Sequence, residues 1–150
     1  MLSVGNDNRL YYNSATAASP TWLPICIVGN VSLDINISEA EVDLRCSSWV
    51  MGLPAKLSGG INFTMARDIG GTAHDVLRGY ALARTPKQYA IASGEIATSA
   101  TQYLKAFMFF TAFPWNQETQ NMAQGDCSLK MAWVEEPAGT LIQPTWVTVP

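Results

Sequence analysis

Residues 31–38 alternate strictly between apolar and polar side chains. The apolar set is Val31, Leu33, Ile35 and Ile37, and the polar set is Ser32, Asp34, Asn36 and Ser38. Successive side chains of a β-strand point to opposite faces, whereas a helix repeats its apolar positions every three or four residues. The segment is therefore predicted to be a half-buried strand, and such a strand needs a sheet.

Similar patterns predict strands through the rest of the chain. We expect them at about residues 10–12, 22–28, 61–65, 88–93, 102–113 and 127–135. Pro24 suits an edge strand, and Gly29-Asn30 predicts a turn. Trp133 falls on the apolar side of its strand, which predicts a core position. The run Phe107–Phe110 has no polar face, so it is either a strand covered on both sides or part of a buried helix over residues 103–113.

One helix is expected at about residues 72–84. Apolar residues recur there at intervals of three and four, as at Val76, Leu77 and Tyr80. Thr72 is placed to cap the first turn, and Thr85-Pro86 ends the helix.

Residues 39–56 break the strand period. Charged side chains occur at Glu39, Glu41, Asp43 and Arg45, and the apolar residues that follow have no helical or strand spacing. A long loop at about 39–56 is expected, and loops of this length in small domains are usually functional. The elements together predict a mainly β protein, a β-sandwich or barrel with one flanking helix. A single domain over residues 1–150, with short N-terminal and C-terminal arms, fits this length.

The surface is expected to carry few charges. Charged residues make up 14% of the chain and hydrophobic residues 48%. This balance leaves apolar area for partners. The formal net charge is -3, and the Lys and Arg residues are scattered singly from Arg9 to Lys130. Tight nucleic-acid binding needs clustered basic residues, so it is not expected.

No targeting or redox pattern stands out. The first residues lack a basic segment followed by an apolar stretch, and no apolar run approaches the ~20 residues that span a bilayer. We therefore expect a soluble protein made in the cytoplasm. Cys26, Cys46 and Cys127 have no CxxC spacing, which favours buried free thiols over disulfides or a zinc site.

The sequence offers little for catalysis. His74 is the only histidine, no GxSxG signature accompanies it, and a position on the helix surface is the expected one. The doublets Gly59-Gly60 and Gly70-Gly71 lack the context of a phosphate-binding loop. No enzyme activity, cofactor or metal is expected.

Two interpretations of the tryptophans stay open. Trp22, Trp49 and Trp115 could stack on a sugar, as in a monomeric carbohydrate-binding β-sandwich. Trp49, however, lies beside Val50 and Met51 in the charged segment, where a large apolar group would be exposed unless something covers it. A partner subunit is one such cover, and packing of the loop on its own domain is the other.

One succession of segments resembles a known family. It comprises the strand and acidic segment at 30–45, then Trp49, then Ile61-Asn62-Phe63-Thr64-Met65, then the helix from Asp75 to Ala83. This order is similar to that of bacteriophage tail tube proteins over roughly residues 22–85. Glu41-Val42-Asp43 and Arg45 match the acidic segment of that family, while Leu44 and Cys46 depart from its Thr-rich spelling.

The resemblance implies a structural virion protein located in the viral tail. Six copies would form a ring, and rings would stack into a hollow tube that conducts DNA without binding it specifically. Tape measure, terminator and initiator proteins would be its partners. A secretion-system tube built on the same fold is a related alternative.

The resemblance also assigns residues. The loop would hold successive rings together through inter-subunit contacts at Glu41, Asp43, Arg45, Trp49 and Met51. The strand that follows the loop would offer Asn62 and Thr64 as candidates for the lumen.

Overall fold

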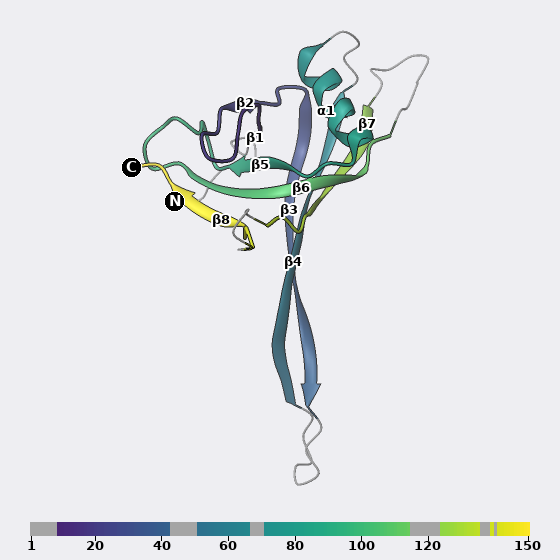
Figure 1. Cartoon of the computed structure of the whole chain (residues 1–150), viewed down its shortest axis with the longest axis vertical. Helices are drawn as coiled ribbons and strands as arrows, with labels where there is room; N and C mark the ends of the chain where they lie inside the picture. The colour runs from purple at the N-terminus through teal and green to yellow at the C-terminus, as the bar shows by residue number, and fades with distance from the viewer. Residues whose placement is uncertain (1–8, 43–50, 67–70, 115–123, 136–138, 140) are drawn as a thin grey trace.

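The computed structural model describes residues 9–42, 51–66, 71–114, 124–135, 139 and 141–150. All eight strands described there belong to one antiparallel sheet (Figure 1). The strands are β1 Arg9–Asn13, β2 Trp22–Pro24, β3 Val28–Val42, β4 Met51–Ala66, β5 Lys87–Ala92, β6 Gln102–Ala112, β7 Gln124–Met131 and β8 Thr145–Thr148. Their order is β2-β1-β5-β6-β7-β4-β3, and β8 pairs with β6. The predicted mainly β class with one helix is confirmed.

The main core lies between the sheet and the helix α1, Thr72–Ala83. Its largest fully buried side chains are Tyr89, Leu10, Ile61, Leu77, Leu104, Met108, Leu129 and Cys127. The Phe110 ring meets Phe63, Tyr89 and Phe113 edge-on, at centroid distances of 6.3, 6.0 and 5.3 Å. Each edge-to-face contact adds roughly 0.5–1.5 kcal/mol beyond the burial of apolar area. This aromatic cluster joins three strands of the sheet.

The helix has the predicted length but a different cap. Gly71 is the N-cap residue and no side chain caps the first turn, so the prediction that Thr72 is the cap is wrong. Thr72 already lies inside the helix, where its backbone is helical and its hydroxyl is no longer positioned as a cap. Arg84 adopts a left-handed conformation and ends the helix. His74 is buried, with its ring 5.8 Å from that of Phe113, instead of lying on the helix surface.

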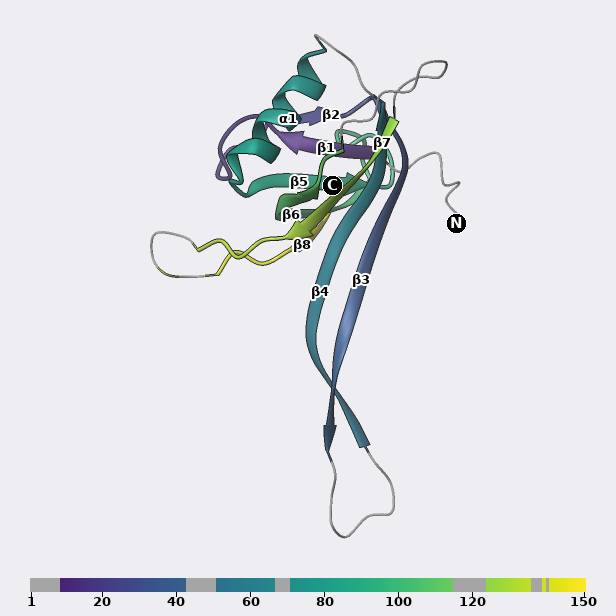
Figure 2. The same cartoon turned by 90° about the vertical axis from the view of Figure 1, so that its right-hand side faces the viewer.

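The strands β3 and β4 form a hairpin that extends far from the rest of the molecule (Figures 1 and 2). The predicted loop over residues 39–56 is therefore wrong for residues 39–42, which end β3, and for residues 51–56, which begin β4. The outer parts of β3 and β4 pair only with each other and cover no core, so they need no continuous apolar face. The charged residues there therefore gave no recognisable strand pattern. Residues 43–50 lie outside the described residues.

Three smaller expectations are also corrected. Gly29 and Asn30 lie within β3, where the register shifts between Gly29 and Ser32 and Asn30 has a φ of 35°. They therefore form a bulge instead of a turn. Residues 103–113 are mostly strand β6, so the helical alternative is wrong. Trp133 is 72% exposed, because β7 ends at Met131 and the alternation no longer sets the direction of its side chain.

Candidate assembly surfaces

An apolar stripe runs from the core out along the β3–β4 hairpin. The paired positions on this face are Leu33 with Ile61, Ile35 with Gly59, and Ile37 with Leu57. Ile61 is fully buried, but Ile35 is 48%, Ile37 63% and Leu57 72% exposed. The sequence pattern that buries the inner part of the strand thus continues past the end of the core. A single copy leaves this apolar face in water.

The backbone of β3 forms a second open surface. β3 is the last strand in the sheet order and pairs only with β4 among the described strands. Its 15 residues exceed the usual five or six of a globular strand. At the opposite end of the order, β2 is a three-residue strand that contains Pro24. The sheet therefore has one short, blunted edge and one long edge that can pair with another chain.

The opposite face of the hairpin carries a hydrogen-bonded polar row. Asn62 on β4 donates from Nδ2 to Asp34 Oδ2 at 2.6 Å, and its Oδ1 accepts from Ser128 Oγ at 2.9 Å. Beside it, Thr64 Oγ1 donates to Asp126 Oδ1 at 3.2 Å. The two residues predicted from the sequence as lumen candidates thus share one exposed or half-exposed polar face that crosses three strands.

The residues predicted as contacts are only partly described. Glu41 is exposed on the outer part of β3, where it pairs with Gly52. Met51 begins β4 opposite Val42. Asp43, Arg45 and Trp49 lie outside the described residues, so whether these five residues meet is not part of the described structure.

The sequence reasoning missed the exposed apolar stripe. Its signal was present, because Leu57 continues on β4 the apolar alternation seen on β3. Ile35, Ile37 and Leu57 continue the pattern beyond the buried positions and are exposed. Exposed apolar faces of this kind are typical of surfaces that bind another molecule.

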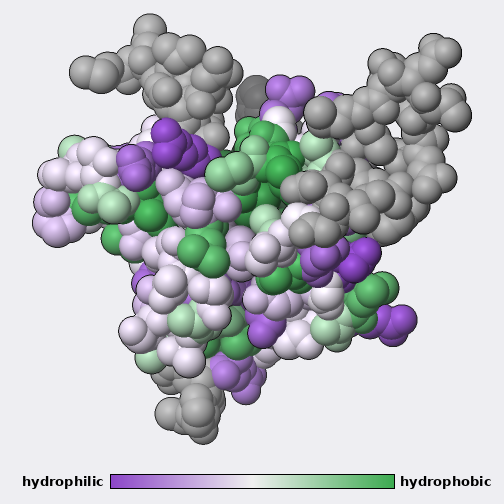
Figure 3. All heavy atoms as spheres, turned by 90° about the horizontal axis from the view of Figure 1, so that it is seen from above, coloured by the Kyte–Doolittle hydropathy of each residue, from purple (hydrophilic) through white to green (hydrophobic). Residues whose placement is uncertain are grey.

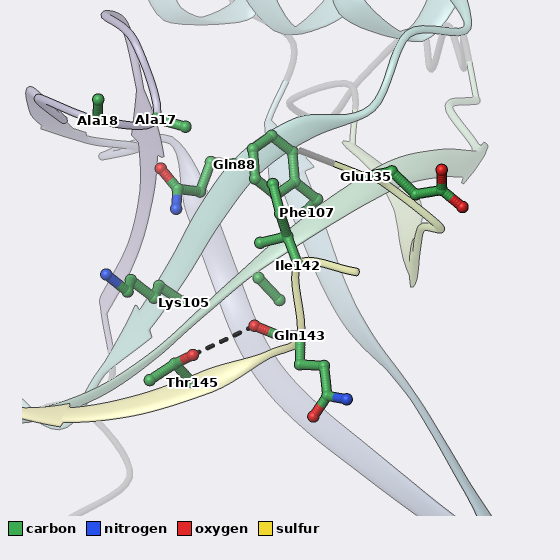
Figure 4. Close-up of a pocket in the computed structure, with 10 residues that line it drawn as sticks. Ala17, Ala18, Gln88, Lys105, Phe107, Glu135, Ile142, Gln143 and Thr145 are labelled. Carbon is green, nitrogen blue, oxygen red and sulfur yellow. Dashed lines mark hydrogen bonds between the residues drawn. The ribbon is translucent and has the colours of Figure 1, made fainter. Parts of the chain in front are cut away.

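A hollow of about 600 Å³ lies over β5 and β6, between the segment after β1 and the segment before β8 (Figure 4). Gln88, Lys105 and Phe107 line its sheet side, and Glu135 and Gln143 come from the C-terminal part. Gln88 Oε1 already accepts from Asn13 Nδ2 at 3.0 Å. No residue of the lining is a histidine, cysteine or serine that could serve as a nucleophile with a base.

Other ingredients of chemistry are sparse in the described part of the chain. No group of three His, Cys, Asp or Glu side chains there could hold a metal ion. Burial, with a smaller contribution from Asp126, raises the pKa of the Cys127 thiol to about 11, which keeps it protonated. Within the described ranges, no helix is long and apolar enough to cross a membrane.

The tryptophans assigned to sugar stacking do not form a described platform. Trp22 is partly buried, and its ring meets that of Tyr103 edge-on at 6.2 Å. Trp49 and Trp115 lie outside the described residues. The exposed Trp133 donates from Nε1 to Glu135 Oε1 at 2.8 Å.

The comparisons with known proteins add a fold-level finding. No family model matches the sequence, and no curated protein matches it. Among solved structures, this chain is similar to one from the tail of an empty gene transfer agent particle, which was refined with C6 symmetry. The TM-score is 0.72 at 11% sequence identity, and the match covers 89% of this chain and 96% of that chain. The SPP1 tail tube has a TM-score of 0.75 at 9% identity, covering 98% and 80%.

A third similar structure comes from the extended sheath–tube complex of an extracellular contractile injection system, with a TM-score of 0.59 at 13% identity, covering 95% and 89%. At these identities the similarity is one of fold. The likeness spans 89%, 98% and 95% of this chain in the three cases. This chain has the fold of the tail tube proteins of phages and phage-like particles.

Proposed function

We propose that this chain is a structural subunit of a phage-type tail tube. Six copies form a ring, rings stack into a hollow tube, and the tube conducts DNA from the virion into the host cell. The fold it shares with tail tube proteins supports this proposal, as does the C6 symmetry of one such tail. The whole chain acts as one tube domain, and it works by assembly instead of catalysis.

The observation that carries the proposal is the exposed apolar stripe of the hairpin. Ile35, Ile37 and Leu57 lie on one face beyond the core. Each such side chain gains roughly 1.5–3 kcal/mol when it is fully buried. In a monomer these three side chains stay in water, and the free energy of burying them does not contribute to stability. Contact with further copies supplies the missing cover.

The long edge of β3 supports ring closure in the same way. A free strand of this length invites pairing with any other chain, and monomeric proteins usually blunt such edges. In a closed ring, each copy pairs the long edge of β3 with its neighbour, so this edge is not left open. The sheet of one copy then continues into the next.

The polar face supports a lumen that does not grip DNA. We assign Asn62 and Thr64 to this lining, with Asp34 and Asp126 as their partners. Their hydrogen-bonding groups are engaged with one another, and the two carboxylates repel phosphates. The acidic net charge of -3 is consistent with this assignment.

The remaining predicted residues become contacts between copies. Glu41 and Met51 lie at the outer ends of β3 and β4, far from the body of the molecule, and Asp43, Arg45 and Trp49 come between them in the sequence. Tape measure, terminator and initiator proteins are the further partners of the tube. The likeness to a chain of a contractile injection system favours one alternative, a tube of such a system.

Electron microscopy of concentrated protein tests the proposal. Purified protein, taken close to its solubility limit, is examined by negative staining while light scattering gives its mass. Rings with six-fold class averages, or hollow tubes, are expected. Protein that stays monomeric at every concentration contradicts the proposal. DNA or a tape measure protein inside isolated particles would distinguish a virion tail from an injection system.

A further inference from the structure

An apolar groove of about 470 Å³ lies between α1 and the end of β6. Its lining includes Ala81 and Leu82 from the helix and Phe110 and Phe113 from or just after the strand. Leu82 is 77% exposed, although the helix otherwise covers the core. Large aliphatic side chains are mostly buried, so this groove is a candidate for cover by another molecule. Figure 3, which views the α1 end of the molecule, shows apolar side chains between polar ones there.

A second exposed apolar group lies beside the other end of β6. Trp146 on β8 pairs with Leu104, near the start of β6, and is 60% exposed. Directly opposed residues of two antiparallel strands point to the same face of the sheet. Leu104 belongs to the core between the sheet and α1. Trp146 therefore lies on the face that α1 covers, but outside the part that is covered.

The two surfaces are separated by most of the length of one strand. β8 pairs with residues 102–105 of β6, whereas the strand's contribution to the groove begins at Phe110. Figure 1 shows β6 running across the direction of the β3–β4 hairpin, with β8 beside its first part and α1 toward its end. Two unlike surfaces on opposite sides of one chain make a heterologous contact, and repetition of that contact by a suitable rotation closes a ring.

We propose that the α1–β6 groove receives Trp146 of the neighbouring copy in the same ring. The inference rests on the tube function proposed above, and it names the side-chain contact between ring neighbours. The indole ring lies against Leu82 and Phe113 in this arrangement. Tryptophan is among the residues that most often dominate the binding energy of an interface, because it fills a pocket with a large and rigid group. Each copy then offers its groove to one neighbour and its tryptophan to the other.

The charges beside the groove are basic. Arg84 follows α1 directly, and Lys87 begins β5, the strand that comes next in the chain. Arg78 of the lining is already paired with Asp75 at 3.1 Å, so these two residues add no net charge. Arg84 and Lys87 therefore leave an excess of positive charge at this end of the sheet.

The charges at the β8 end are mainly acidic. Glu95 lies close to the end of β8 through Thr101, whose hydroxyl donates to the Glu95 carbonyl and whose own carbonyl accepts from the backbone N–H of Val149. Glu135 and Lys105 line the hollow beside β8. Two carboxylates and one ammonium group leave an excess of one negative charge among these residues. Opposite charges around an apolar contact favour a second copy as the occupant and favour the meeting of unlike ends.

Site-specific cross-linking tests the proposal. In a background with Cys26→Ser and Cys46→Ser, every copy carries both Leu82→Cys and Trp146→Cys, and the assembled protein is oxidised mildly. Cys127 is retained, since its buried thiol reacts poorly. Denaturing electrophoresis without reduction is expected to show a covalent ladder that ends at six copies, because a contact within one ring links each copy only to its ring neighbours. A ladder that continues beyond six copies places the contact between rings and overturns the proposal.

Thr145→Cys in place of Trp146→Cys is the matched control. Thr145 is exposed and adjacent on β8, but it points to the opposite face of the sheet, where it lines the hollow. Little cross-linking to position 82 is expected from it. Tubes without cross-links between positions 82 and 146, or equal cross-linking from position 145, overturn the contact and leave the tube function intact. Absence of any ring or tube from the unsubstituted protein at high concentration overturns the tube function and the contact with it.

Charge and truncation variants measure the same contact without new cysteines. Leu82→Asp places a carboxylate in the groove and is expected to raise the critical concentration for assembly roughly tenfold or more. Ala83→Asp adds the same charge in the same turn of α1, at an exposed position outside the lining, and should change the critical concentration little. Trp146→Ala should act like Leu82→Asp, and the double variant should be little worse than either, because both changes remove one contact. Fully additive effects on the logarithm of the critical concentration overturn the proposal.

Discussion

Asn62 ties β4 to both of its neighbouring strands through a single amide. Its Nδ2 donates to Asp34 on β3 at 2.6 Å, and its Oδ1 accepts from Ser128 on β7 at 2.9 Å. A carboxamide carries a donor and an acceptor on one planar group, so it satisfies an acid on one side and a hydroxyl on the other. An aspartate of the same shape would satisfy only the hydroxyl.

Asn62→Asp is therefore expected to lower the free energy of unfolding by about 1 kcal/mol at neutral pH. It replaces a charge-assisted hydrogen bond with two facing carboxylates on an exposed surface. Urea unfolding of the variant and the wild type at pH 7 measures the effect.

Asn62→Ala serves as the neutral control. It removes the same donor without adding charge, so its deficit should be smaller than that of Asn62→Asp. Equal deficits of the two variants would show that the two carboxylates do not repel each other.

Gly60 is held by a close approach of backbones. A Cβ atom at this position would lie 2.5 Å from the carbonyl oxygen of Leu129 on β7. Gly60→Ala forces β4 and β7 apart, and overpacking of this kind costs about 1–3 kcal/mol. Thermal unfolding followed by circular dichroism should show a clear drop in Tm.

Gly79 offers a matched control for the same substitution. It lies within α1, and a Cβ there would meet nothing within 4 Å. Gly79→Ala is expected to stabilise the protein by about 0.5–1 kcal/mol, because alanine loses less conformational freedom in a helix. A loss of stability in both variants would point to a cause other than the contact with Leu129.

The inner part of the fold could be predicted from the sequence because one face of each strand is buried. Ile61 and Leu129 follow the alternation and are buried. Periodicity identifies a face, but it does not tell whether anything covers that face. Ile37 continues the same pattern and is exposed, so the projection of the hairpin was not predictable from a single chain.

Other misses have similar local causes. The charged residues Glu39 and Glu41 suggested a loop, yet they lie in a strand whose two faces both meet solvent. Trp133 follows an alternation that stops with β7 at Met131. The two lumen candidates, Asn62 and Thr64, do share a polar face. This follows from their positions two residues apart on one strand.

The buried thiol of Cys127 predicts a loss of stability at high pH. Burial, with a smaller contribution from Asp126, raises its pKa in the folded protein from 9.0 to about 11. The folded state therefore holds this proton more tightly than the unfolded state does. The resulting contribution to the free energy of unfolding is fully present below pH 9 and is lost as the pH rises to about 11. It amounts to roughly 2 kcal/mol.

Two alanine variants isolate this contribution. Cys127→Ala removes the buried thiol, so its stability should fall less steeply between pH 9 and pH 11 than that of the wild type. Cys26→Ala changes an exposed thiol and should keep the wild-type slope. Burial also holds the pKa of Tyr89 well above its usual value, but both variants share that effect. Identical slopes for Cys127→Ala and Cys26→Ala would refute the assignment.

Ile37→Asp is expected to block assembly while the single copy stays folded. The side chain lies outside the core, so the far-ultraviolet circular dichroism and the Tm should match those of the wild type. Assembly instead requires burial of this face, and a charge there would be buried without a partner. Light scattering and electron microscopy at high concentration should find monomers. Asn36→Asp adds the same charge on the opposite face of the same strand and should still assemble. If both variants form tubes equally well, the apolar stripe has no part in assembly.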